Sequence, residues 1–208
     1  MLDGMNTLDV LVMLAGWSID VVGIVWLATA VWFAAVRPGG FWGKVWHFVR
    51  TFLPEPWMIA GIIVLSVVIR LLPHGIWDPI TWKVGVLRGI GAILVVASAG
   101  LMVWARLALG TMWAGRPMIQ QDHQLRTGGP YRLVRHPIYT GLIGLMLGLT
   151  LIAGFGSSIV LLVFVLGWLL RRVRVEDHML IDTFGDDYRS YRRRVPALVP
   201  FAGPLIRA

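Results

Sequence analysis

The sequence predicts an all-α integral membrane protein with about five transmembrane helices, a helical hairpin made by the fourth and fifth, and a cytoplasmic C-terminal helical tail. Of its 208 residues, 57% are hydrophobic and only 14% are charged. A soluble globule of this size needs more polar surface than this composition supplies. Long apolar runs, each near the roughly 20 residues that cross a bilayer core as a helix, support the same interpretation.

The apolar runs define the expected helices. The final run is too long for one span and contains GFGSS, Gly154 to Ser158, where a tight turn can join two helices. Asp20 interrupts the first run. The span could therefore begin near Ile19 and leave Leu8 to Trp17 as a shallow segment. The aspartate is either a functional charge within the span or a residue near the outer interface. The runs lie near Val10 to Val36, Trp57 to Leu72, Gly85 to Leu109 and Ile138 to Leu170.

The positions of the 19 basic residues predict the orientation of the chain. Most lie in the first connection, the third connection and the tail, 171–208, whereas the opposite side has Arg70, Lys83 and Arg88. By the positive-inside rule the N-terminus is outside and the C-terminus is cytoplasmic, in the plasma (inner) membrane if the chain is prokaryotic. We expect no cleaved signal peptide, because the N-terminus is acidic. The connections carry Arg37, Lys44, Arg50, Arg106, Arg116, Arg126, Arg132 and Arg135.

Composition also narrows the classes of partner. We expect a single membrane domain over 1–208, with N-terminal spans in 1–109 and the chemistry in 110–208. The net charge of +8 fits topology and membrane lipids better than nucleic acid, because the arginines lie in short loops beside the spans. The chain has no cysteine, and its five histidines show no paired spacing, so we expect no metal site.

The stretch GGPYRLVRHPIYTG, 128–141, has an unusual combination of groups in front of an apolar run. Its glycines and first proline break any preceding helix, and Pro137 suits the first turn of the next one. That helix would present free N–H groups and a positive dipole end at the cytoplasmic interface, beside Arg135 and His136. The stretch therefore predicts a site for an anion.

A second group of polar residues lies in the tail. Val173, Asp177 and Leu180 have helical spacing, and the aromatic residues Phe184, Tyr188 and Tyr191 continue that stripe. One interpretation is a basic amphipathic helix on the membrane surface. The adjacent carboxylates of Glu176 and Asp177 argue against it, since they suit a bound cation better than anionic lipid.

Together these motifs resemble the isoprenylcysteine carboxyl methyltransferase family, as a compact member of the prokaryotic type. The resemblance rests on Leu109, Gly110 and Trp113, on L.TGGPY..VRHP.Y from Leu125 to Tyr139, on the acidic pair, and on the pattern from Phe184 to Pro200. It covers the C-terminal half of the chain. Many relatives have two glutamates where this chain has Glu176 and Asp177.

The resemblance implies methyl transfer from S-adenosylmethionine, held between the RHP segment and the tail. The residue chemistry agrees with that donor. Arg135, His136 and the helix beginning at Pro137 suit its carboxylate, the acidic pair suits its ammonium, and aromatic side chains suit its adenine and sulfonium. The predicted cofactor-binding residues are Tyr131, Arg135, His136, Pro137, Tyr139, Glu176, Asp177, Tyr188 and Tyr191, and the predicted catalytic residues are Glu176, Arg135 and Arg172.

The acceptor stays open, and we expect a lipophilic or lipid-modified molecule. An ionised carboxylate needs no base, and Arg171, Arg172 or Arg174 could orient it. An amine needs one, for which Glu176 and His136 are candidates. A phospholipid amine or a small thiol is the alternative acceptor. The remaining alternatives are an enzyme resembling the sterol reductases, with a nicotinamide cofactor, and a membrane protein without enzymatic activity.

Overall fold

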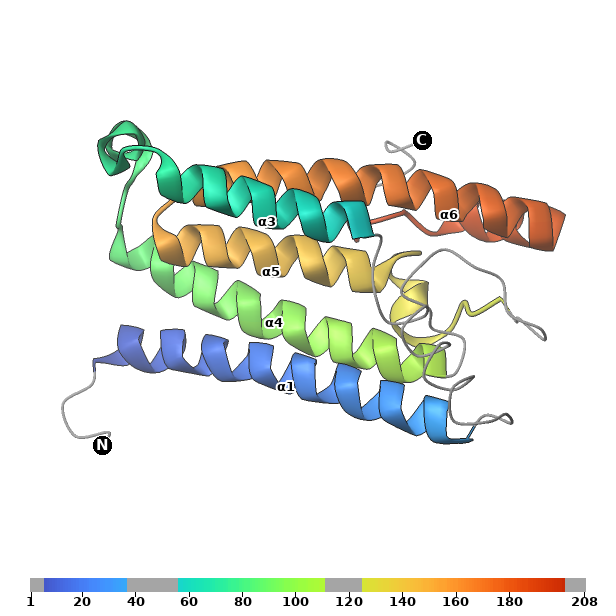
Figure 1. The fold of residues 1–208 in the computed structure, drawn as a ribbon. Coiled ribbons are helices and arrows are strands. Elements are labelled where there is room, and N and C mark those ends of the chain that lie inside the picture. Colours follow the sequence, from blue (N-terminus) through green and yellow to red (C-terminus); the bar gives the residue numbers. More distant parts are fainter. Residues whose placement is uncertain (1–5, 37–55, 111–124, 201–208) are drawn as a thin grey trace.

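A computed structural model describes residues 6–36, 56–110 and 125–200, and within these ranges the fold is helical. Successive long helices run in alternating directions, so α1 begins at one end of the bundle and α6 ends at the other (Figure 1). This alternation is the arrangement that a chain crossing a bilayer repeatedly needs. The elements are α1 (Thr7–Val36), α3 (Pro56–Leu71), η1 (His74–Ile80), α4 (Gly85–Leu109), η3 (Gly129–Arg132), α5 (Pro137–Ala153) and α6 (Ser158–Arg194).

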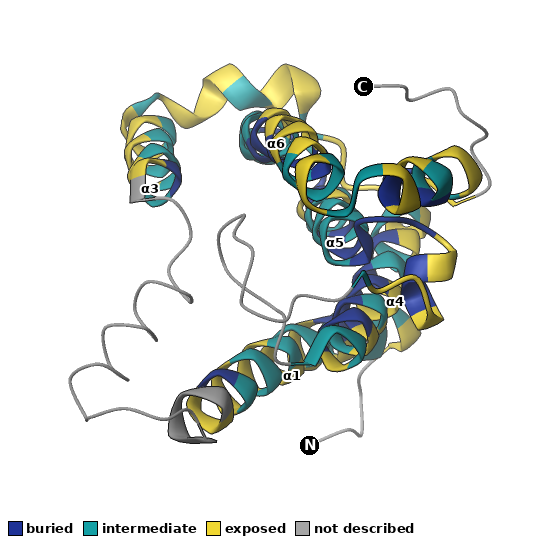
Figure 2. Cartoon of the chain, turned by 90° about the vertical axis from the view of Figure 1, so that its right-hand side faces the viewer, coloured by how far each residue is buried: buried dark blue, intermediate teal, exposed yellow. Residues whose placement is uncertain are grey.

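The predicted membrane character is confirmed, whereas the number of spans stays a prediction. By length and composition, Thr7–Trp32 of α1 and all of α4 can cross a bilayer, and α3 with η1 would make a third span bent by 97°. The apolar α5 has only 17 residues. Many residues of α1 and α3 are exposed (Figure 2), and many of these are large apolar residues, as expected of surfaces that face lipid.

The first helix is continuous. It begins at Thr7 and includes both the segment that could have been shallow and Asp20, which is exposed within the helix. Where the membrane-spanning part of this helix starts stays a prediction. The basic connection with Arg37, Lys44 and Arg50 lies outside the described residues, as do Trp113, Arg116 and Arg207.

The tightest packing joins α4 and α5. A Cβ at Gly91 would lie 2.6 Å from the carbonyl oxygen of Gly148, so the two backbones touch without side chains between them. Small residues permit such an approach in membrane helices. Gly148 therefore allows the close approach of α4 and α5. Gly85 and Gly89 instead face Leu8 of α1 at ordinary contact distance.

The predicted hairpin is present between α5 and α6. The first of these helices ends at Ala153, and the backbone then reverses through Gly154, Phe155 and Gly156, all of which have positive φ. The turn is held from outside, because Trp82 N–H donates to the carbonyl oxygen of Gly154 at 2.9 Å. This hairpin places the beginning of α5 and the polar half of α6 at the same end of the bundle (Figure 1).

One expectation about the tail is wrong. The aromatic residues after Phe184 do not continue the stripe of Asp177, because the helix bends at Gly185, whose φ of 52° and ψ of −122° are not helical. Eleven residues of straight helix would separate Asp177 from Tyr188 by about 16 Å along the axis. The bend instead brings the two side chains into hydrogen-bond contact. A glycine is required here, since side chains disfavour this backbone conformation.

Candidate active site

The RHP segment and the end of the chain form one unit. Arg135 N–H donates to Pro196 O at 2.9 Å, and His136 N–H donates to Ala197 O at 3.1 Å. One turn into α5, Thr140 Oγ1 donates to a further carbonyl of the same strand-like stretch, on Leu198, at 2.7 Å. The backbone after α6 is therefore fixed against the beginning of α5, although Thr140 and Leu198 are 58 positions apart in the sequence.

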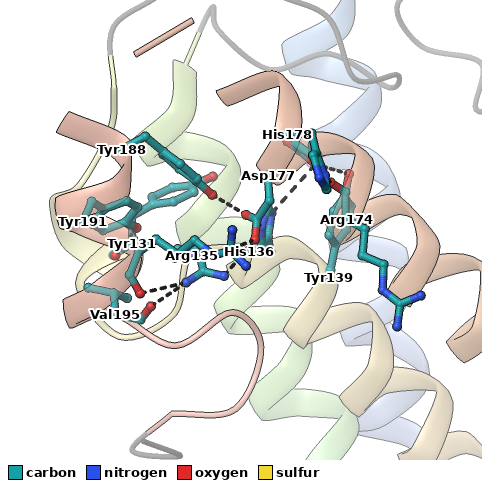
Figure 3. A network of polar contacts seen from close by, with 12 residues as sticks. Tyr131, Arg135, His136, Tyr139, Arg174, Asp177, His178, Tyr188, Tyr191 and Val195 are labelled. Carbon is teal, nitrogen blue, oxygen red and sulfur yellow. Dashed lines mark hydrogen bonds and ion pairs between the residues drawn. The ribbon is translucent and has the colours of Figure 1, made fainter. Parts of the chain in front are cut away.

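Asp177 lies at the centre of this unit (Figure 3). Its side chain is only 4% exposed. Arg135 Nη2 donates to Oδ2 at 2.8 Å, His136 Nε2 lies 2.9 Å from Oδ1, and the Tyr188 hydroxyl also donates to Oδ1. Burial would raise the pKa of Asp177, but the hydrogen bonds from His136 and Tyr188 and the positive charge of Arg135 outweigh it and hold the pKa at about 2. The carboxylate is therefore ionised and its acceptor sites are occupied.

Arg135 is bound by the protein itself. Besides Asp177, its guanidinium donates through Nη1 to the carbonyl oxygens of Arg192 and Val195, both at 3.0 Å. Its Nε is buried and has no hydrogen-bond partner among the described residues. The anion role predicted for Arg135 stays a prediction, because the structure already pairs Nη1 with the end of α6 and Nη2 with Asp177.

Glu176 has a different environment from its neighbour. Its side chain is 32% exposed, and its Oε2 accepts a hydrogen bond from the Tyr139 hydroxyl at 2.7 Å. The other oxygen, Oε1, has no hydrogen-bond partner among the described residues. His136 Nδ1 lies 3.8 Å from Oε2 on the inner side. Of the acidic pair, Glu176 is thus the carboxylate that a ligand can approach.

A buried cation, Arg172, lies next to the accessible carboxylate of Glu176. Arg172 Nε donates to the Tyr139 hydroxyl at 2.8 Å, and its guanidinium carbon lies 5.1 Å from the centre of the Trp168 ring and 5.6 Å from that of Tyr139. Tyr139 in turn stacks parallel to His136. Tyr139 therefore links the cation to Glu176, and the three side chains hold one another in place.

The other predicted tyrosines form a packed wall behind Asp177. Tyr188 and Tyr191 meet edge to face, and the Tyr191 hydroxyl donates to the backbone oxygen of Tyr131 at 2.5 Å. Burial raises the pKa of all three phenols, and the negative charge of Asp177 adds to the rise at Tyr188. All three phenols are neutral, and the hydrogen bond from Tyr191 holds η3 against the end of α6. Their predicted contact with a cofactor stays a prediction.

The structure separates the three arginines that could orient an acceptor. Arg171 and Arg174 are exposed, and the former lies over Trp57 of α3, so of the three candidates for orienting an acceptor only Arg172 reaches the site.

Trp168 was not predicted. It precedes Arg172 by four residues, so the two share one helix face, and that spacing was the available signal. Its indole Nε1 is buried with no partner among the described residues.

This arrangement defines a chemical preference. A partly exposed carboxylate beside aromatic surface suits an organic cation, and a buried guanidinium one helical turn away suits a group that is or becomes anionic. Among the described residues, no group of three or more acidic or histidine side chains is placed to hold a metal ion. Trp168 and Tyr139 belong to an apolar cluster of side chains, so both halves of the site lie next to the apolar part of the bundle.

Comparisons with known proteins identify relatives of this chain. A family model described as phospholipid methyltransferase matches residues 87–187. The cobalt-zinc-cadmium resistance protein CzcN of Cupriavidus metallidurans is 30% identical over 79% of this chain and 71% of its own length. A solved structure of the eukaryotic intramembrane Ras methyltransferase, an isoprenylcysteine carboxyl methyltransferase, superimposes with a TM-score of 0.55 and 18% identity, covering 95% of this chain and 87% of that one.

Two groups of curated methyltransferases are also similar. The protein-S-isoprenylcysteine O-methyltransferase of Schizosaccharomyces pombe is 36% identical over 38% of this chain, and the methanethiol S-methyltransferase of Pseudomonas deceptionensis is 25% identical over 73% of it. The matched segments span 34% and 62% of those two proteins. The chain therefore belongs to the membrane protein family that includes the isoprenylcysteine carboxyl methyltransferases, which confirms the family predicted from the motifs.

Proposed function

We propose that this chain is an S-adenosylmethionine-dependent membrane methyltransferase that modifies a lipophilic or small apolar acceptor. One observation carries the proposal. Glu176, within the segment that the phospholipid methyltransferase model matches, is a partly exposed carboxylate with an oxygen that has no partner among the described residues. A carboxylate in that state is suited to an organic cation, and membership of the family points to a methyl donor.

The residues present fit the proposed donor. Glu176 would hold its ammonium group, the half-buried Tyr139 offers aromatic surface, and the beginning of α5 at Pro137 is where a carboxylate is expected. In this proposal the site is supported by the residues packed beside it, which are Arg135, His136, Asp177, Tyr131, Tyr188 and Tyr191. Bound there, S-adenosylmethionine would supply an activated methyl group.

Arg172 is the residue that we propose for orienting the acceptor. Its side chain is buried, its Nε is fixed on the Tyr139 hydroxyl, and two aromatic rings flank its guanidinium. A cation held rigidly beside apolar helix surface attracts an ionised carboxylate or thiolate without reorganising. An amine acceptor would need a base, and Glu176 and His136 are the nearest candidates.

The comparisons name two acceptor chemistries. The isoprenylcysteine enzymes match a short segment, whereas two of the methanethiol enzymes match 73% and 72% of this chain at lower identity. We keep a lipid-modified carboxylate as the first candidate and a small thiol as the second. In either case we propose that the site faces the cytoplasm from a plasma or inner membrane, with membrane lipids as its surroundings.

A methyl-transfer assay tests this function directly. Purified protein in lipid nanodiscs is incubated with methyl-labelled S-adenosylmethionine and, separately, a prenylated cysteine analogue, methanethiol or a total lipid extract. We expect label in a carboxyl ester or a thioether, and none with Arg172→Ala. Absence of transfer to every acceptor, together with absence of S-adenosylhomocysteine binding, would contradict the proposal. Binding of a reduced nicotinamide instead would favour the reductase alternative.

A further inference from the structure

His136 lies between the two carboxylates of the acidic pair. Its Nε2 is 2.9 Å from Asp177 Oδ1, and its Nδ1 is 3.8 Å from Glu176 Oε2. An imidazole that is neutral carries one proton, and the hydrogen bond made by one nitrogen decides which nitrogen keeps it. The state of the inner carboxylate therefore decides what the ring offers to the outer one.

Asp177 can only accept hydrogen bonds. Its oxygens take donors from Arg135, Tyr188 and His136, and burial leaves no water-facing alternative. An ionised carboxylate has no proton to give, so Nε2 of His136 must carry the hydrogen of that contact. The remaining nitrogen, Nδ1, then has a lone pair and faces Glu176.

We infer that Asp177 is a positioning residue that holds His136 in the Nε2–H tautomer. Nδ1 of His136 and the Glu176 carboxylate then form a pair of hydrogen-bond acceptors for one cationic ligand group. Two acceptors 3.8 Å apart can share one ammonium. This inference rests on the proposed function for the identity of the ligand, and on the geometry alone for the tautomer. It also reverses the expected role of His136, from an anion donor to a cation acceptor.

The substitution Asp177→Asn separates the two tautomers. Arg135 is an obligate donor at Oδ2, so the asparagine must turn its carbonyl oxygen to the guanidinium and its NH₂ to His136. His136 Nε2 then has to accept, and the proton moves to Nδ1. The His136 ring would then present a donor to the cationic ligand group, and the pair of acceptors would lose one of its two members.

The first measurement is long-range proton–nitrogen NMR on the full chain labelled with ¹⁵N-histidine, at a pH about two units above the ordinary histidine pKa of about 6.5. His136→Gln identifies the signals by their loss. We expect the Nε2–H tautomer in the wild type and in Tyr188→Phe, which removes a donor to Asp177 and leaves its carboxylate. We expect the Nδ1–H tautomer in Asp177→Asn.

The matched control is Asp186→Asn, the same chemical change on the same helix at a side chain that is 95% exposed and pairs with Arg189 at the surface. It should keep both the tautomer and the wild-type affinity for S-adenosylhomocysteine, whereas Asp177→Asn should weaken that affinity about tenfold or more.

An Nδ1–H or doubly protonated ring in the wild type would overturn the inference, even if Asp177→Asn does not fold. So would a reversed tautomer with unchanged affinity. If the wild type has the expected tautomer but binds no S-adenosylhomocysteine, the proposed function fails, and the tautomer assignment stands.

Discussion

At the scale of single residues, two adjacent carboxylates have separate tasks. Successive positions on a helix point about 100° apart, so Asp177 turns into the contact with the RHP segment while Glu176 stays at its rim. Because Glu176 and Asp177 are adjacent in the sequence, the sequence alone suggests that they share one role in binding a cation. The partners that divide them, Arg135 and His136, lie about 40 residues earlier in the chain, where local spacing gives no information.

The low pKa of Asp177 predicts an acid-sensitive structure. Its carboxyl pKa is about 2 in the folded protein against an ordinary 3.8, so it stabilises the fold above the ordinary value, by about 2 kcal/mol. That contribution is lost as the pH falls from about 5 towards 2. Thermal unfolding in detergent should show this loss in the wild type and not in Asp177→Asn. Parallel pH profiles for the two proteins would contradict the assignment.

At the scale of elements, the bend in α6 makes the site possible. Without it, Tyr188 and Val195 would continue away from Asp177 and Arg135 along a straight helix. The sequence favours a helix on both sides of Gly185, and helical spacing alone therefore predicted one continuous stripe. A glycine in a helix usually costs a little stability, and only the fold-back reveals why this one is needed.

Replacing Gly185 with alanine isolates this bend. A Cβ there would meet no atom within 4 Å, so the only penalty is the backbone conformation, about 1 to 3 kcal/mol. We expect a lower unfolding temperature and easier proteolysis after residue 185. Gly167→Ala is the control, because Gly167 lies in the same helix with open space around it and should be neutral or stabilising. Equal effects of both changes would show that the bend carries no strain for alanine.

Much of the fold could be predicted from the sequence, and less of the site. The long apolar runs fixed the positions of the helices, and Gly154 with Gly156 marked the hairpin, because these signals are local. The residues of the site were found through the motifs of a family. Which of these residues contact one another could not be found in this way, since it depends on contacts across the bundle, such as that of Thr140 with Leu198.

At the scale of the whole molecule, the alternating helices put α1's beginning and α6's end at opposite ends of the bundle (Figure 1). Together with the excess of arginine near the site, this predicts an external N-terminus and a cytoplasmic C-terminus. A reporter fused after Ala208 should be active only in the cytoplasm, and one fused before Met1 only outside. Both reporters on the same side would contradict the five-span arrangement.

The proposed function requires that Glu176 holds the cationic end of a methyl donor. Equilibrium binding of S-adenosylmethionine and S-adenosylhomocysteine to the wild type, to Glu176→Gln and to the exposed control Asp182→Asn tests it most directly. Both ligands carry the ammonium, so Glu176→Gln should weaken both alike by about tenfold or more, because a charge-assisted hydrogen bond is lost. Asp182→Asn should bind as the wild type does. Wild-type affinity for both ligands in Glu176→Gln, with wild-type turnover, would contradict the claim.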